Sequence, residues 1–521
     1  MALQGWWITL VLSVLIAVNV EEVFGYWGLK GQKYGLFSNR DASTNGVSTL
    51  WMEQKLDHFG GESSTWKQRY FASDKYGNKS SKIVYLVLGG ESALGDDCPL
   101  KGSWTLTAEK HSGLIFCLEH RYYGESQPAS DLSTENLRYL SSRQALADAE
   151  NFVSYINANY SLASDTKWIV YGGSYSGSLA VWLKYTYPKV IYGAVSYSGP
   201  LEAVLDFKEY LQIVENDLTQ YNSECTNTIK SAYGELDEIT TSCLEDIELY
   251  EYIDTSFKLC ETIETSDGVA NDISNFFEIL TDKTFATVAQ YNNHPNLKDV
   301  NINKVCDILV NESLGTPMDR LSAVNTLMLS DEECLDYKYD KSISRLSNIT
   351  SDPAKYERQW VYQTCTEFGF FQTSSQNSSV FGTKFDVDFF VNICQDLFGQ
   401  NFNRSFIEAG IAETNSRYQG KSVKVENVIY VNGDVDPWHV LGKLETSGET
   451  GSKAIVIKGA SHCAGFYATT VNDSEEITAA KKEVQDTISQ WLKTTEPNSS
   501  TRVSHSIFMS LIISMLGTLL L

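Results

Sequence analysis

The stretch that most constrains the fold runs from Trp168 to Ala180 and reads WIVYGGSYSGSLA. Its apolar start predicts a short buried strand, two glycines and Ser174 follow, and a helical pattern then continues to a proline. A strand, a tight glycine turn with a serine, and a helix form the layout of a nucleophile elbow, in which a strained backbone exposes the serine hydroxyl. Ser176 stands where the usual G-x-S-x-G pattern has its second glycine, so the motif departs from that pattern at one small residue.

Apolar runs before and after this motif predict a parallel sheet. Residues 82–88 and 113–118 are nearly continuous apolar segments, typical of strands that helices cover on both faces. An amphipathic helix is expected at 144–157 and a further strand at 194–199. Strands that alternate with helices in this way indicate a doubly wound α/β fold. Residues 26–80, in contrast, are polar and irregular in pattern.

The pattern changes at about residue 204, where helical periodicity and acidic side chains replace the strand signals. Strand patterns return at 425–431 and 454–457, and a final amphipathic helix follows at 474–493. We therefore expect an α/β domain in two parts, residues 26–203 and 411–495, with a mainly helical cap inserted as residues 204–410.

Both ends of the chain carry apolar segments that predict targeting. Residues 1–25 indicate a signal peptide, because a mainly apolar run precedes two glutamates. Residues 496–521 contain small polar residues, a short spacer and a terminal apolar run. This order resembles a GPI-attachment signal, with a short transmembrane helix and an untargeted apolar tail as alternatives.

The remaining composition is that of a secreted glycoprotein. The ten cysteines are even in number and lack metal-site spacing, so they predict disulfides, with Cys98 and Cys117 as one candidate pair, and no metal or cofactor is expected. Eight N-x-S/T sequons predict glycosylation at Asn78, Asn159, Asn311, Asn348, Asn377, Asn403, Asn472 and Asn498. These features predict an extracellular or lysosomal protein, or one held at the cell surface by a GPI anchor. The formal net charge of -25 argues against nucleic acid as a partner, because phosphates would be repelled.

A nucleophilic serine needs a histidine as its base and an acid that orients the histidine. In the α/β-hydrolase order the acid and the histidine follow the serine, which leaves three of the seven histidines once His294 of the helical insert is set aside. His505 lies in the C-terminal tail, and His439 would share a loop with the candidate acids. His462 follows the strand at 454–457, where sites form in open α/β sheets, so it is the predicted base.

The acid and the oxyanion hole are expected at other strand ends. The strand before 432 runs into NGDVDPW, in which Asp434 and Asp436 both qualify, and the proline after Asp436 favours it by holding it extended. An oxyanion needs two backbone N–H donors. We expect one from Tyr175, directly after the serine, and one from the loop after residue 88, where Gly90 and Glu91 are the candidates.

Longer motifs resemble the serine exopeptidase family that includes lysosomal Pro-Xaa carboxypeptidase, dipeptidyl peptidase II and thymus-specific serine peptidase. The matching stretches lie within about residues 50–495. They read QKLDHF (54–59), QRYF (68–71), GGE (89–91), EHRYYGES (119–126), QALAD (144–148), GGSY (172–175), WVYQTCTEFG (360–369), NGDVDPW (432–438) and SH (461–462). The TCTEFG and SHCA forms are more similar to the thymus-specific branch.

The resemblance implies an α/β-hydrolase fold with a helical domain inserted over the cleft. It carries over Ser174 as nucleophile, Asp436 as acid and His462 as base, and it selects Asp436 over the neighbouring candidate. It also implies that Tyr362 and Glu367 lie near the substrate, that the substrates are peptides cleaved near proline, and that homodimers can form.

These observations predict a serine exopeptidase that works through an acyl-enzyme. The sequence does not choose between a carboxypeptidase and a dipeptidyl peptidase. The alternative is a catalytically weak, glycosylated surface or binding protein that retains the hydrolase fold, since Ser176 crowds the elbow and a fold does not imply an activity.

Overall fold

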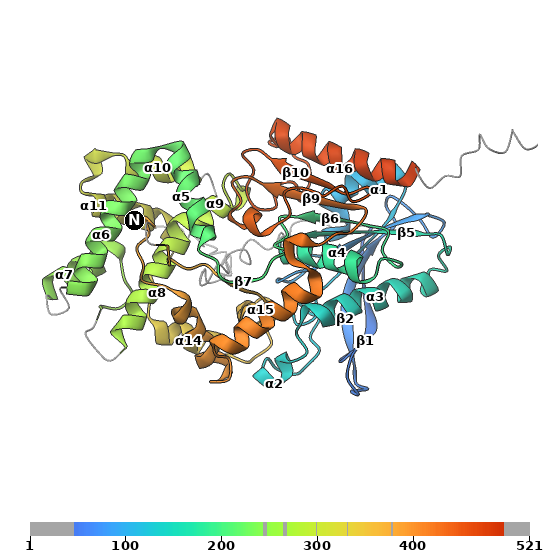
Figure 1. The fold of residues 1–521 in the computed structure, drawn as a ribbon, viewed down its shortest axis with the longest axis horizontal. Helices are drawn as coiled ribbons and strands as arrows, with labels where there is room; N and C mark the ends of the chain where they lie inside the picture. Colours follow the sequence, from blue (N-terminus) through green and yellow to red (C-terminus); the bar gives the residue numbers. More distant parts are fainter. Residues whose placement is uncertain are drawn as a thin grey trace, which may run out of the picture.

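The computed structural model describes residues 46–242, 247–263, 268–297, 300–330, 332–376 and 379–493. Its centre is an eight-stranded sheet in the order β1-β2-β4-β3-β5-β6-β9-β10 (Figure 1). The strands are β1 (Ser48–Lys55), β2 (Thr65–Ser73), β3 (Ile83–Leu88), β4 (Leu114–Leu118), β5 (Lys167–Gly173), β6 (Gly193–Tyr197), β9 (Val428–Gly433) and β10 (Lys453–Ile457). All neighbours from β4 across to β10 pair in parallel, whereas β1 with β2 and β2 with β4 are antiparallel.

Helices cover both faces of the sheet, as its continuous apolar strands require. Alternate residues of β3 enter different cores, so that Leu86 lies with residues of α3 and α4, and Tyr85 lies with residues of α1 and α16. These helices are α1 (Trp104–His111), α3 (Ser142–Asn159), α4 (Tyr175–Thr186) and α16 (Glu475–Lys493). The predicted α/β fold with a largely parallel sheet is confirmed.

An N-terminal hairpin contradicts the expectation that residues 26–80 are irregular. β1 and β2 form an antiparallel ladder that pairs Ser48 with Ala72 and Lys55 with Thr65. β1 is the edge strand of the sheet, and most of its side chains are exposed. Because an edge strand meets water, its sequence lacks the continuous apolar run that marks the central strands.

Between β6 and β9 the chain leaves the sheet and forms a helical region that lies beside it (Figure 1). Its main elements are β7 (Val204–Asp206), α5 (Glu209–Tyr221), α6 (Ser223–Ser242), α7 (Ile247–Phe257), α8 (Val269–Thr281), α9 (Thr287–Gln290), α10 (Ile302–Leu309), α11 (Pro317–Leu329), α12 (Tyr339–Leu346), α13 (Glu357–Gln363), β8 (Gly369–Phe371), α14 (Val387–Phe398) and α15 (Arg404–Tyr418). Because β6 and β9 are neighbours in the sheet, this region is an insertion between adjacent strands. The predicted inserted cap is therefore present, and its boundaries at 204 and 410 stay predictions.

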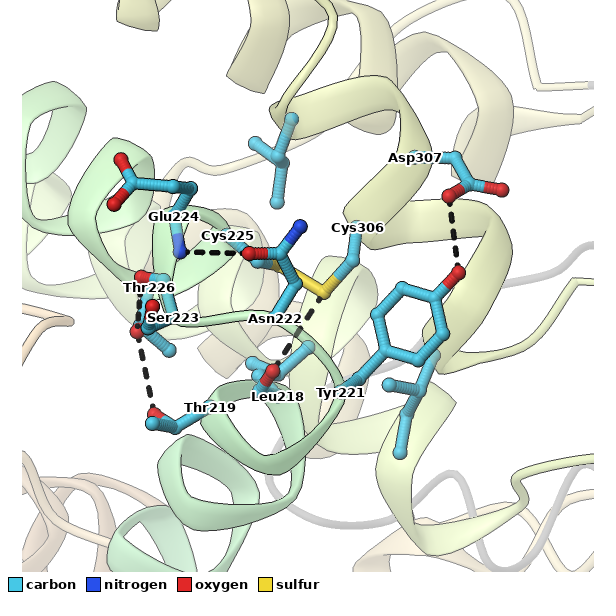
Figure 2. Close-up of a disulfide and its surroundings, with 12 residues drawn as sticks. Leu218, Thr219, Tyr221, Asn222, Ser223, Glu224, Cys225, Thr226, Cys306 and Asp307 are labelled. Carbon is cyan, nitrogen blue, oxygen red and sulfur yellow. Dashed lines mark hydrogen bonds between the residues drawn. A yellow bond between two sulfur atoms is a disulfide. The ribbon is translucent and has the colours of Figure 1, made fainter.

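Four disulfides join described cysteines, and they link Cys98 with Cys117, Cys225 with Cys306, Cys260 with Cys334, and Cys365 with Cys394. The first is the candidate pair from the sequence. Figure 2 shows the second, which joins the start of α6 to α10 inside the cap. Beside it, the Asn222 side chain accepts a hydrogen bond from the Glu224 amide at 2.9 Å and so caps the start of α6. A bridge across 81 residues stabilises the cap by about 4.5 kcal/mol in the chain-entropy description.

Cys463 departs from the expectation that an even number of cysteines are all paired. Its thiol is free and buried, and its Sγ lies 3.7 Å from the carbonyl oxygen of Tyr197. Its amide donates to the Ser198 hydroxyl at 2.9 Å. The side chain thus packs the loop after His462 against the end of β6, as a small apolar residue would. Cys243 lies outside the described residues.

The targeting predictions fall mainly outside the described residues. The signal peptide (1–25), the tail (496–521) and the sequons at Asn377 and Asn498 all lie there. The other six sequon asparagines are exposed, and their glycosylation stays a prediction. Across the described ranges, each helix is too short or too polar to cross a bilayer.

Candidate active site

Ser174 lies on the turn between β5 and α4, in the strand, turn and helix layout that the sequence predicts. Its backbone has φ 59° and ψ -133°, a conformation that residues other than glycine rarely adopt. The turn needs its glycines, because a Cβ on Gly172 would lie 1.9 Å from the Ser176 carbonyl oxygen and one on Gly177 would lie 2.8 Å from the Tyr197 oxygen. Such strain is typical of functional sites, because it holds a side chain out of the helix.

Ser176 fits the elbow and braces it. Its side chain is fully buried, and its hydroxyl donates to the Gly173 carbonyl oxygen at 2.8 Å. The same hydroxyl accepts a hydrogen bond from the Gly173 amide at 3.0 Å. Glycine could make neither bond, so the departure from G-x-S-x-G adds two local restraints at the residue before Ser174.

His462 and Asp436 form a buried pair at the ends of two neighbouring strands. Asp436 follows β9, His462 follows β10, and both Asp436 carboxylate oxygens lie 2.9 Å from Nδ1 of His462. The side chains are 0% and 2% exposed. Because Nδ1 is bonded to the acid, Nε2 is the ring nitrogen left to act on a hydroxyl.

The two rival residues from the sequence occupy other positions. Asp434 is exposed and accepts a hydrogen bond from the Gly459 amide at 2.6 Å, so it structures the turn after β9. His439 lies in the short 3-10 helix η8 (Pro437–Leu441), with its Nδ1 2.6 Å from the main-chain oxygen of Asp436. Neither of them takes part in the bidentate contact between the carboxylate and the imidazole.

Asp436 also determines the protonation of His462. Burial alone lowers the pKa of His462, but the Asp436 carboxylate and the neighbouring Cys463 side chain outweigh it, and the net pKa lies well above its ordinary value. The Asp436 carboxylate thus favours the imidazolium, the species that forms when a histidine takes a proton from a nucleophile.

The Glu91 side chain is a part of the site that the sequence did not indicate. Its carboxylate lies near the Ser174 hydroxyl and near His462. Burial raises the pKa of Glu91, and its own amide, His462 and Ser174 offset this only in part. The signal in the sequence is an acid directly after two glycines at the end of a strand.

The proposed oxyanion donors lie on either side of the elbow. Tyr175 is the first residue of α4. Gly90 follows β3, and a Cβ on it would lie 3.4 Å from the Ser176 side chain, at ordinary van der Waals distance. Within the described part of the chain, the amides of Tyr175, Gly90 and Glu91 donate to no other residue. All three stay candidates for the donors to an oxyanion.

A pocket opens between the cap and the loop that carries Asp436. Aromatic and aliphatic side chains form most of its wall. The residues lining it are Glu278, Trp360, Val361, Thr364, Gly369, Phe370, Phe371, Gln372, Phe390, Ile393, Cys394 and Trp438. Trp438 connects the pocket to the buried pair, because its ring centre lies 6.4 Å from that of His462. Glu278 is the only charged residue among the described residues that line it.

Tyr362 and Glu367 lie in the segment that borders this pocket but are not among its lining residues. The Tyr362 ring is buried and packs edge-on against Phe398 at 5.2 Å. Glu367 accepts hydrogen bonds from the amide and hydroxyl of Ser142, the latter at 2.6 Å, and burial raises its pKa to about 7. The Glu367 hydrogen bonds join the cap to the start of α3. A role of Tyr362 or Glu367 in substrate binding stays a prediction.

A parallel sheet with a serine on a strained strand-to-helix turn, and an aspartate–histidine pair after its last two strands, defines a hydrolase of the α/β-hydrolase fold. Residues 54–484 match the family described as serine carboxypeptidase S28. The chain belongs to this family, as its motifs predicted, and it is a serine peptidase.

Curated relatives agree with this assignment along most of their length. Mouse thymus-specific serine protease is 31% identical over 462 residues, which cover 86% of this chain and 88% of that protein. The human protein of the same name is 29% identical over 455 residues, covering 85% and 86%. Mouse lysosomal Pro-X carboxypeptidase is 27% identical over 418 residues, covering 75% and 78%. The higher identity to the thymus-specific proteins agrees with the branch that the motifs indicated.

Proposed function

We propose that this protein is a serine exopeptidase that trims peptides near proline through Ser174, His462 and Asp436. The observation that carries the proposal is the buried, bidentate contact of Asp436 with Nδ1 of His462. It lies at the ends of β9 and β10, and only β6 separates β9 from β5, the strand that leads to Ser174. An aspartate so placed fixes the imidazole tautomer that a general base needs.

In the proposed mechanism His462 Nε2 takes the Ser174 proton while Oγ attacks the peptide carbonyl carbon. The amides of Gly90 and Tyr175 donate to the oxyanion that forms. His462 then gives the proton to the leaving amine, the peptide bond breaks, and an acyl-enzyme remains. A water molecule, deprotonated by His462, attacks the acyl group and releases Ser174.

The pocket beside Trp438 supports a preference for the amino end of the substrate. Its walls are aromatic and aliphatic, a lining that favours apolar groups. Its single charged lining residue, Glu278, would repel a terminal carboxylate and attract a terminal amine. Within the exopeptidase proposal we therefore favour the dipeptidyl peptidase type over the carboxypeptidase type.

A secretory or lysosomal location is the compartment that we infer. Four disulfides fit an oxidising compartment, and one relative is named a lysosomal carboxypeptidase. Attachment through a GPI anchor and assembly into dimers remain predictions from the sequence.

The alternative, a catalytically weak binding protein, loses its main support, because Ser176 braces the elbow. The test is to incubate the secreted protein with a proline-containing peptide and to identify the products by mass spectrometry. We expect loss of a dipeptide from the amino end by wild type and no turnover by Ser174→Ala. Equal turnover by folded Ser174→Ala would reject the triad, and loss of the last residue instead would reverse the preferred end.

A further inference from the structure

A glutamine of the cap contacts the loop that carries the catalytic acid. Gln290 is the last residue of α9 and is 4% exposed. Its side-chain oxygen accepts hydrogen bonds from the Tyr210 hydroxyl at 2.6 Å and from the Trp438 indole N–H at 2.9 Å. Its side-chain nitrogen donates to the Tyr291 hydroxyl at 2.8 Å. The amide group therefore has partners at both ends in a buried setting, where each unmade bond is costly.

Trp438 transmits this contact to Asp436. The Trp438 main-chain amide donates to Oδ1 of Asp436 at 3.0 Å, while its indole N–H donates to Gln290. The same carboxylate oxygen also contacts Nδ1 of His462. The position of Trp438 therefore affects the direction in which the Asp436 carboxylate faces the imidazole.

The main chain of the same cap segment contacts the loop of the histidine. The His462 amide donates to the Gln290 carbonyl oxygen at 2.9 Å, and the Ser461 hydroxyl donates to the Asn292 carbonyl oxygen at 2.9 Å. Tyr291 stands edge-on to the His462 ring, with ring centres 6.2 Å apart. One residue of the cap thus bonds to the histidine directly and to the acid through a single tryptophan.

We propose that Gln290 is a positioning residue of the active site, which holds the loops of Asp436 and His462 in register from the cap. This inference rests on the proposed triad. It assigns the cap a part in the chemistry beyond limiting access, because the geometry of the acid and base depends on a cap residue. Misplacement of a catalytic group by about 1 Å can reduce a rate by about a hundredfold.

The experiment compares three variants by their rate of labelling with a fluorophosphonate, and by kcat and KM on the peptide that wild type cleaves. Gln290→Leu removes all three side-chain bonds. Gln290→Glu keeps the shape, and its neutral carboxyl still offers one donor and one acceptor. Gln359→Leu is the matched control, because Gln359 is a cap glutamine that is 1% exposed and donates to the Tyr122 carbonyl oxygen at 3.0 Å, away from both catalytic loops.

We expect Gln290→Leu to lower the labelling rate and kcat about tenfold or more, with KM changed less than about twofold. We expect Gln359→Leu to lower the melting temperature but to keep kcat within about twofold of wild type. Gln290→Glu should recover activity at acidic pH, where its carboxyl is neutral, and lose it as the pH rises.

Three results would overturn the inference. These are a wild-type kcat in folded Gln290→Leu, an equal loss of kcat in Gln359→Leu, and a pH profile of Gln290→Glu identical to that of wild type. If Ser174→Ala retains turnover, the proposed function itself fails. If Ser174→Ala is inactive while the Gln290 variants keep the wild-type kcat, only the positioning role fails.

Discussion

The carboxylate of Glu91 is buried beside the hydroxyl of Ser174, which acts to lower the pKa of that carboxyl. An ionised carboxylate at this place opposes the negative charge that develops on the attacked carbonyl oxygen, whereas a neutral carboxyl does not. Because burial raises the pKa of Glu91, the neutral form persists to a higher pH than for an ordinary glutamate.

We therefore expect the kcat of wild type to decline as the pH rises through the pKa of Glu91, and we expect Glu91→Gln to remove that decline. The measurement is kcat from pH 4 to pH 9 for both proteins. Glu125→Gln, a change at an exposed glutamate, is the control and should keep the wild-type profile. If kcat of Glu91→Gln declined by the same amount at the same pH, the decline would come from the titration of another group.

The two aspartates after β9 provide a matched pair of variants. Asp436→Asn leaves His462 without a carboxylate on Nδ1, so we expect kcat to fall by about a thousandfold or more and the pKa of His462 to fall. Asp434→Asn changes an exposed turn residue and should keep kcat within about twofold of wild type. Turnover of a proline-containing peptide measures both, and similar losses in the two variants would contradict the assignment of Asp436.

The two hydrogen bonds between the Ser176 hydroxyl and the main chain of Gly173 should stabilise the fold. Ser176→Ala removes two hydrogen bonds to Gly173 in a fully buried setting, so we expect the free energy of unfolding to fall by about 1–3 kcal/mol. Ser176→Gly restores the usual motif but also removes the bonds, and it should not exceed wild type in kcat. Urea unfolding and peptide turnover are the measurements. A higher kcat in Ser176→Gly would show that the hydroxyl hinders the elbow.

The raised pKa of Glu367 should make its contribution to the free energy of unfolding larger at acidic than at neutral pH. The unfolded chain ionises this residue near 4.5, whereas its pKa in the fold is about 7 because of burial, so the folded state binds more protons between these values. The free energy of unfolding should therefore fall as the pH rises from about 4.5 to about 7, by up to about 3 kcal/mol from this group.

Glu367→Gln should flatten this dependence, because the amide does not titrate. Urea unfolding at pH 5 and pH 7.5 measures it, with the exposed Glu109→Gln as the control that keeps the wild-type slope. An unchanged slope in Glu367→Gln would place the titrating group elsewhere.

The acidic side chain of Glu278 lines the pocket and should favour the amino end of a peptide there. If it meets a terminal amine, Glu278→Gln should raise KM for a free-amine peptide by about tenfold, with kcat little changed, because a charged hydrogen bond is lost. A peptide with an acylated amino end serves as the control and should show the same KM with both proteins. An unchanged KM for the free-amine peptide would remove this role from Glu278.

The central strands could be predicted because burial on both faces demands apolar residues throughout, as in β3. β1 was missed because an exposed edge strand has no such requirement. The site residues could be predicted because they follow strand ends and because the chain has few histidines. The predicted acid Asp436 and base His462 are in contact in the structure.

Contacts between distant parts of the chain could not be predicted. Gln290 meets Trp438 and His462 only because the cap folds back onto the sheet, and nothing in the residues around 290 indicates those partners. The same holds for the hydroxyl of Ser176, since a motif shows residue size but not the direction of a hydrogen bond. The free thiol of Cys463 could not be predicted either, because the number of cysteines does not show which thiols lie close together.

The most direct test is to treat the folded, secreted protein with a fluorophosphonate and to locate the modified residue by peptide mass spectrometry. An activated serine at the elbow should give a single adduct on Ser174, formed rapidly in wild type and at least about a hundredfold more slowly in Asp436→Asn. No adduct on Ser174 in protein shown to be folded, or equal labelling rates in the two proteins, would contradict the proposed triad.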